Sequence, residues 1–185
     1  MNTTAPDLIS PVIGFRQWRL RDDALWSLHA EDRWARGLLT ARCLGDDAHD
    51  DPAPLNGCTC GFYAWYAPTP RTASAATADL VAGAVALWGR VELHAHGMRA
   101  QHAMVVALAL PLSWGAKRRR LLAVADALEV PTVPARRLKR AALEHGDVIS
   151  RSMRPQDTTP NKRAAPGEPA PARLYAVSDG LVRRR

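Results

Sequence analysis

The sequence predicts an α+β protein, with a mainly antiparallel β-sheet body followed by two C-terminal helices and a disordered basic tail. Three observations predict this. Strand-like segments separated by polar turns fill the first two thirds of the 185-residue chain. A helical hydrophobic pattern follows over residues 117–130. Beyond residue 150, five prolines and scattered arginines give a composition too poor in apolar side chains to form a core.

The charge is unevenly distributed and divides the chain into the same parts. Residues 1–115 carry 9 arginines against 11 acidic residues, a net of −2, whereas residues 116–185 carry 16 cations against 7 acidic residues, a net of +9. We therefore expect a β body over 1–115, a basic helical segment over 116–149 and a Pro/Arg-rich tail over 150–185. A polyanionic partner would bind the last two parts.

The N-terminal third is expected to form short strands over residues 12–20, 24–29 and 37–44, with polar turns between them. Trp18, Trp26 and Trp34 recur every eight residues, which indicates one large packed ring for each strand and turn. Another strand is expected over 60–66.

A β-hairpin is the clearest element in the sequence. Residues 85–94 and 99–110 are both strand-like, and His96–Gly97 fits the centre of a tight turn, with Gly97 at positive φ. This register places Ala95 opposite Met98. It predicts one apolar face and one charged face, the latter carrying Trp88, Arg90, Glu92, His94, Arg99 and Gln101.

Two helices are expected over residues 117–130 and 135–145, the second led by Pro134 and ended by Gly146. The first turn of the first helix holds four cations, an arrangement that the helix dipole disfavours and that a bound anion would compensate. These candidate phosphate contacts are Lys117, Arg118, Arg119 and Arg120.

Residues 124–146 resemble a helix-turn-helix, a motif that reads DNA in the major groove. The second helix would carry four cations toward phosphates and base edges: Arg136, Arg137, Lys139 and Arg140. Glu129 stands where the motif usually has glycine, and Pro131 and Pro134 stiffen the turn. The alternative is an extended segment packed on the sheet and followed by a solvated basic helix.

Four residues form a candidate metal site of the Cys3His type: Cys43, His49, Cys58 and Cys60. Thiolates and imidazole suit structural Zn2+, and Gly57 and Gly61 would allow the C-x-C turn to point both thiols at one ion. Three ordinary cysteines and a redox dithiol are the alternatives. His94, His96 and His102 compete with His49 as the fourth ligand, although the hairpin register makes His102 a core residue.

Some of these features occur together in a recognisable order. A cysteine is followed by an acidic loop with a histidine, then by C-x-C-G-F-Y-A over 58–64, A-L-W-G-R-V-E over 86–92 and G-x-R-A over 97–100. The pattern covers residues 13–112 and resembles small uncharacterised proteins of actinobacteria and their phages. The resemblance implies a metal site and an actinobacterial or phage source, and it implies no reaction.

The sequence therefore predicts a non-enzymatic, zinc-stabilised accessory or regulatory protein that binds nucleic acid, DNA rather than RNA, through phosphates. A protein-interaction adaptor whose basic tail docks on an acidic partner is the alternative. A thiol or metal enzyme is a third hypothesis, although no nucleophile elbow, phosphate loop or paired-carboxylate motif is present. No signal peptide or membrane-length apolar run is found, so a cytoplasmic protein without membrane contact is expected.

Overall fold

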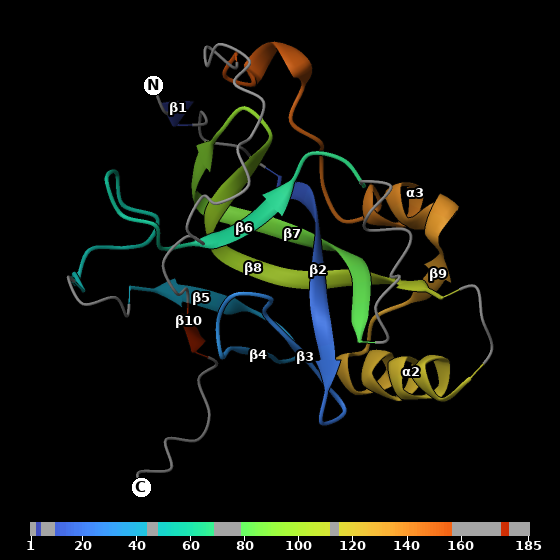
Figure 1. Cartoon of the computed structure of the whole chain (residues 1–185). Helices are drawn as coiled ribbons and strands as arrows, with labels where there is room; N and C mark the ends of the chain where they lie inside the picture. Colours follow the sequence, from blue (N-terminus) through green and yellow to red (C-terminus); the bar gives the residue numbers. More distant parts are fainter. Residues whose placement is uncertain are drawn as a thin grey trace, which may run out of the picture.

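The computed structural model describes residues 3–4, 10–43, 48–68, 79–111, 115–156 and 175–177. These residues form a sheet of mainly antiparallel strands and two short helices, in agreement with the expected α+β class (Figure 1). The strands are β1 (Thr3–Thr4), β2 (Val12–Arg21), β3 (Ala24–Trp26), β4 (Arg33–Trp34), β5 (Leu39–Arg42), β6 (Phe62–Trp65), β7 (Leu80–Leu93), β8 (Gly97–Leu110), β9 (Thr132–Pro134) and β10 (Tyr175–Val177). The helices are α2 (Ala116–Leu128) and α3 (Leu138–Ala142), with the 3-10 turns η1 (Ala135–Arg137) and η2 (Arg151–Met153).

Four of the strands close into a small barrel. β7 pairs with both β2 and β8, β8 pairs with β6, and β6 returns to β2 through the single pair Trp65–Phe15. β5 continues the sheet beyond β8, and β10 adds a further antiparallel strand to β5. Each of these four barrel strands therefore has a partner strand on both sides.

The two faces of β2 enter two different hydrophobic clusters because side chains alternate along a strand. Val12, Trp18 and Leu20 belong to the larger cluster, which fills the inside of the barrel. Ile13 and Phe15 belong to a smaller cluster on the outside. Trp18 and Trp34 are fully buried and pack edge to face at 5.3 Å, which confirms the packing role expected of these two rings.

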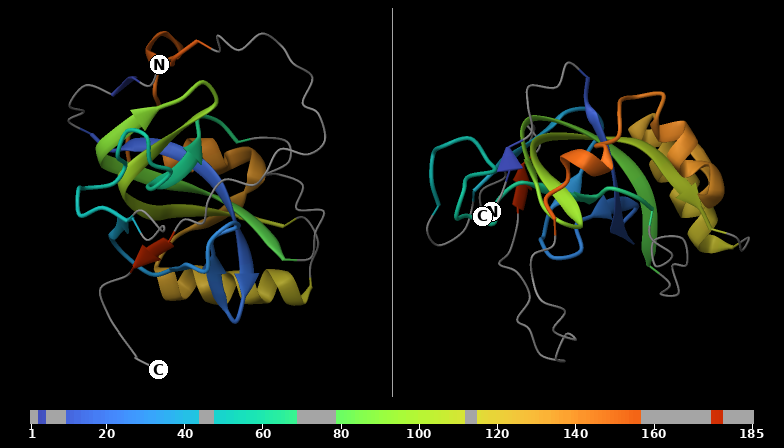
Figure 2. Two further views of the ribbon diagram at one scale, coloured as in Figure 1. Left: turned by 60° about the vertical axis from the view of Figure 1, so that its left-hand side comes forward. Right: turned by 90° about the horizontal axis from the view of Figure 1, so that it is seen from above.

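Helices α2 and α3 pack on opposite faces of this wall. The buried side of α2, Leu121, Val124, Ala125 and Leu128, joins the inner cluster, whereas Leu138 and Ala142 of α3 join the outer one. Alanines at 82, 84, 86, 107 and 109 form much of the surface beneath α3, and their small side chains let the helix approach the strands. Figure 1 and the left view of Figure 2 show α2 below the strands and α3 beside the middle of the sheet.

The hairpin forms, but the expected register is wrong. Leu93 pairs with Met98 and Val91 with Ala100, so the connection is the three-residue loop 94–96. Gly97 is a strand residue, and a Cβ there would lie 2.4 Å from the carbonyl oxygen of Ala64 on β6. A bulge at Gly89, which has a φ of 75°, shifts the register again between Trp88 and Val91.

The segment between the two helices does not form the turn of a helix-turn-helix. Glu129 ends α2 in the left-handed conformation, and β9 then pairs in parallel with β8, with Val133 opposite Ala109. The expected second helix is shortened to η1 and the five residues of α3. The extended segment packed on the sheet, which was the alternative, is the observed arrangement.

Parts of the predicted tail and acidic loop lie outside the described residues. Residues 44–47, 157–174 and 178–185 belong to these parts, so the predicted disorder of the tail stays a prediction. Within the tail, η2 and β10 are described. Among the residues that the structure describes, no helix is both long and apolar enough to cross a membrane.

Candidate metal centre

The four predicted ligands converge. The ligand atoms of Cys43, His49, Cys58 and Cys60 all lie within 4.8 Å of one another. Cys43 Sγ is 3.5 Å from Cys58 Sγ, and Cys60 Sγ is 3.4 Å from His49 Nε2. Cys60 is buried, and the other three are half-buried. Such a group of thiols and one imidazole could hold a metal ion.

The C-x-C turn owes its shape to the two flanking glycines. Gly57 and Gly61 have φ values of 84° and 115°, conformations that side-chain-bearing residues rarely adopt. A Cβ on Gly61 would also lie 3.2 Å from Pro54 Cβ, within a tightly packed corner. The backbone can therefore turn sharply on both sides of the cysteine pair, as the sequence predicts.

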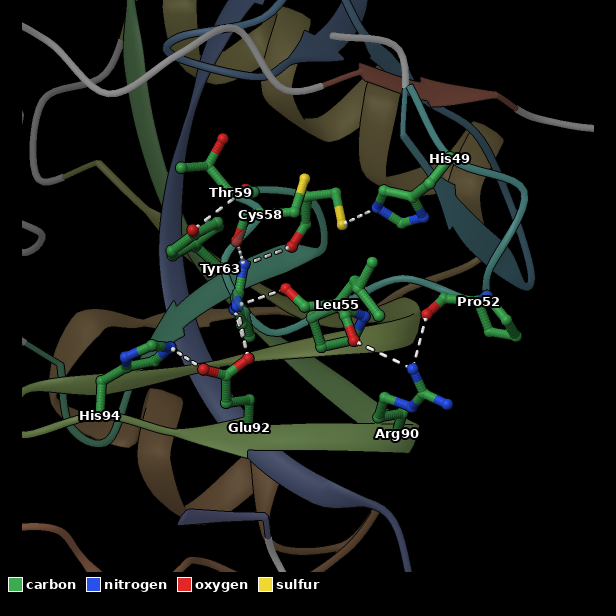
Figure 3. A network of polar contacts seen from close by, with 12 residues as sticks. His49, Pro52, Leu55, Cys58, Thr59, Tyr63, Arg90, Glu92 and His94 are labelled. Atoms are coloured by element: carbon green, nitrogen blue, oxygen red, sulfur yellow. Dashed lines mark hydrogen bonds and ion pairs between the residues drawn. The ribbon is translucent and has the colours of Figure 1, made fainter. Parts of the chain in front are cut away.

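His49 is oriented by a second contact. Its Nδ1 lies 3.0 Å from the carbonyl oxygen of Asp51, so Nδ1–H is the donor of this hydrogen bond. The proton on Nδ1 leaves the lone pair of Nε2 free to face the thiols. Backbone carbonyls commonly orient metal-bound histidines in this way, and Figure 3 shows the imidazole beside the cysteine side chains.

Cys58 and Cys60 have different thiol pKa values because their surroundings differ. Burial alone would raise the pKa of the Cys58 thiol, but hydrogen bonds from the Cys60 backbone and from the His49, Cys43 and Cys60 side chains lower it to about 6. Burial and the neighbouring thiolates raise the pKa of Cys60 to about 11. In this group of three thiols, deprotonation of Cys58 is therefore favoured and deprotonation of Cys60 is disfavoured. A bound cation would stabilise both thiolates.

Arg99 of β8 holds the loop that carries Cys58 and Cys60. Its Nη1 donates to the carbonyl oxygens of both cysteines, and its Nη2 donates to that of Leu55 at 3.1 Å. Its Nε donates to Glu92 Oε2 at 2.8 Å, and both side chains are buried. A buried guanidinium satisfied in this way fixes three carbonyls of the loop and places a positive charge next to the thiols.

Arg90 secures the other end of the loop. Its Nη1 donates to the carbonyl oxygens of Pro52 at 3.1 Å and Pro54 at 3.4 Å (Figure 3). Two residues of the predicted charged face are not exposed to solvent: Glu92 is 7% exposed and Arg99 is 2% exposed. The missed signal is the pair of opposite charges, which face each other only in the observed register.

The competing histidines lie outside the ligand group. His102 Nδ1 is 3.1 Å from Thr40 Oγ1, and its ring packs near Trp88. His94 Nε2 is 3.7 Å from Glu92 Oε1, and burial lowers the pKa of His94. His96 is exposed. Among the described residues, His49 is therefore the histidine that lies together with the three cysteines.

The predicted phosphate contacts are divided between two sites on opposite faces of the barrel wall. On α2, Arg120 Nε pairs with Asp23 Oδ1 at 3.0 Å, and Lys117 and Arg118 are half-buried with partners of their own. On η1 and α3, the four cations Arg136, Arg137, Lys139 and Arg140 are all exposed. Arg136 and Arg140 are four residues apart and therefore share one side of the helical segment.

No protein-family model matches this sequence, and neither a curated protein nor a solved structure matches it. The resemblance to actinobacterial and phage proteins therefore stays a prediction.

Proposed function

We propose that this chain is a zinc-stabilised, non-enzymatic protein that binds nucleic acid through its basic C-terminal region. The main support for zinc binding is that the four potential ligand atoms lie within 4.8 Å of one another. Tetrahedral Zn2+ with bonds of about 2.3 Å to sulfur and about 2.0 Å to nitrogen implies S–S and S–N edges of roughly 3.8 and 3.5 Å. The two contacts of 3.5 and 3.4 Å are close to these values.

The donor set supports a structural role for the ion. Three cysteines and one histidine fill all four tetrahedral positions, whereas catalytic zinc sites keep one position for water or substrate. The ion would join the end of β5 to the loop before β6, two segments that are not hydrogen-bonded strand partners. Zinc would therefore stabilise the folded chain by linking these segments.

The exposed cations of α3 and η1 support nucleic-acid binding. Leu138 and Ala142 attach this segment to the barrel, so its cations are held on a rigid support and face solvent. None of the four pairs with an acidic side chain among the residues that the structure describes. Phosphates are suitable partners for such a group, and DNA remains the preferred one.

Metal analysis tests the first half of the proposal. Purified protein is expected to contain one zinc per chain by inductively coupled plasma mass spectrometry. Cys43→Ser should lose the ion, whereas the conservative control Thr59→Ser, within the same turn but outside the ligand group, should retain it. Stoichiometric zinc in the Cys43→Ser variant, or none in the unaltered protein, would refute the site.

Salt dependence tests the second half. Affinity for a labelled DNA duplex is expected to fall by roughly 0.9 log units per log unit of salt for each phosphate neutralised. Replacing Arg136 and Arg140 together by alanine should reduce this slope by about two phosphates. A complex that is insensitive to salt, or no complex at low salt, would exclude phosphate binding by this region.

The adaptor function is a second candidate, favoured by β10. Tyr175–Val177 of the tail pairs with β5, so this part of the tail can add a strand to the sheet by backbone hydrogen bonds. A chain ending at residue 156 discriminates the two functions. If it loses capture of an acidic protein partner while keeping affinity for nucleic acid, the tail serves as an adaptor.

A further inference from the structure

Two aromatic side chains stand on the outer face of the barrel, on β6. Phe62 and Ala64 are buried in the inner cluster, so Tyr63 and Trp65 point to the other side by the alternation of the strand. They are 38% and 36% exposed. The spacing of i and i+2 places them side by side along one face.

The surroundings of these rings differ at the two ends of β6. Tyr63 lies beside the metal loop, because its hydroxyl donates to the carbonyl oxygen of Thr59 at 3.0 Å. Trp65 pairs with Phe15 across the barrel closure, and Phe15 belongs to the outer cluster beneath α3. Figure 1 shows β6 running toward the side of the molecule where α3 lies.

The exposed cations of η1 and α3 lie over the same outer cluster. Leu138 packs into that cluster, and its immediate neighbours Arg137 and Lys139 are exposed. The outer face of the barrel therefore presents two aromatic rings on β6 and, where α3 packs on β7 and β8, a group of cations that form no ion pair with a described acidic residue. We call this set, Tyr63, Trp65, Arg136, Arg137, Lys139 and Arg140, the outer platform.

We propose that the outer platform binds single-stranded nucleic acid, with unpaired bases stacked on Trp65 and Tyr63 and phosphates held by the cations of η1 and α3. This proposal rests on the proposed nucleic-acid function and specifies its partner. Bases inside a duplex are already stacked on each other, whereas those of a single strand offer free ring faces. Aromatic stacking combined with cations along the backbone is the usual chemistry of single-strand recognition.

Fluorescence anisotropy with labelled oligo(dT), oligo(rU) and a DNA duplex, at about 50 mM salt, tests the proposal. We expect a single strand to bind more tightly than the duplex. Trp65→Ala should weaken single-strand binding about tenfold, within the range that loss of one stacked base gives, and leave duplex binding unchanged. Trp65→Phe, which keeps a ring, should retain most of the affinity.

Two further variants serve as controls for folding and for the position of the binding surface. Trp65→Leu keeps apolar volume against Phe15 and should weaken binding like Trp65→Ala, so a folding defect in the alanine variant does not decide the result. Leu122→Ala on α2 removes a side chain of similar exposure, 39%, from the opposite face and should have no effect. Circular dichroism and metal content should match the unaltered protein in the leucine variant.

The outcomes distinguish single-strand binding by the outer platform from phosphate binding in general. If duplex and single strand bind equally and Trp65→Leu changes neither, the outer platform is refuted while phosphate binding stands. If no oligonucleotide binds at low salt, both fail. Loss of a protein partner in Trp65→Leu, with oligonucleotide binding unaltered, would also refute the platform and assign the rings to protein recognition.

Discussion

The candidate metal centre and the basic segment of η1 and α3 present their residues in opposite ways. The centre collects cysteines and a histidine from a strand end and a loop, and it is supported by buried charges on a hairpin. The basic segment presents neighbouring cations directly to solvent, fixed by two apolar side chains. The first depends on the whole fold, whereas the second depends on where one short helix is attached.

This difference predicts how each region responds to mutation. A change in the metal centre alters packing, charge balance and ligand geometry together, so one substitution has a large effect. A change on α3 removes one partner for phosphate and leaves the fold intact.

Replacing Cys60 by serine should have the largest effect. It replaces the buried thiolate ligand by a hydroxyl, which is a much weaker ligand for Zn2+, so zinc affinity should fall by more than about 100-fold. Competition with a chromogenic chelator measures the affinity. The variant should also have a lower Tm than the zinc-loaded protein, because Cys60 is part of the inner cluster as well as of the candidate ligand group. Unchanged zinc affinity would contradict the assignment of Cys60 as a ligand.

Arg99→Met should come next. It leaves Glu92 buried without its cation and frees three loop carbonyls, a loss of about 3–5 kcal/mol in the free energy of unfolding. Urea denaturation measures this loss, and zinc affinity should fall as well.

Arg16→Met is the matched control for Arg99→Met. Arg16 is half-buried, and its guanidinium lies over the Trp34 ring at 4.3 Å and donates to Ser27 Oγ; neither contact involves the metal loop. Arg16→Met should therefore leave zinc affinity unchanged whatever its effect on stability. Equal zinc affinity in the two methionine variants would remove Arg99 from the metal centre.

The acidity of Cys58 should be visible in metal-free protein. Its pKa is lowered from 9.0 to about 6 in the folded chain, so its thiolate contributes stability that is fully present above pH 9 and is lost as the pH falls through 6. Alkylation by iodoacetamide as a function of pH should show a midpoint near 6 that Cys58→Ser abolishes. A midpoint near 9 would contradict the hydrogen-bonded arrangement.

Single substitutions of exposed cations should have the smallest effects. Arg120→Ala breaks an ion pair with Asp23 that is open to solvent, at a cost of about 0.2–1 kcal/mol in stability. Its effect on nucleic-acid affinity should be weaker than that of Arg140→Ala, because the Arg140 side chain has no described acidic partner. Anisotropy titrations at one salt concentration compare the two variants, and a larger loss for Arg120→Ala would shift the binding site to α2.

Local patterns in the sequence predict most of the elements and the four residues that converge in the candidate metal centre. The alternation around β2 and the hairpin, the helical spacing of α2 and the C-x-C turn between two glycines are properties of neighbouring residues. The same is true of Cys43 and His49, whose residue types suit zinc wherever they meet. The helix-turn-helix resemblance failed because 132–134 can be extended as readily as turned, and pairing with β8 selects the extended form.

The sequence by itself determined the strands, the first helix, the ligand types and the location of the positive charge. Only the tertiary structure decided the hairpin register, the closure of β6 on β2 and the burial of Arg99 with Glu92. The physical reason is that periodicity reports which side of an element is apolar, and it holds no information on which distant residue lies opposite. The observed register sets Glu92 opposite Arg99 and places this buried cation beneath the cysteines.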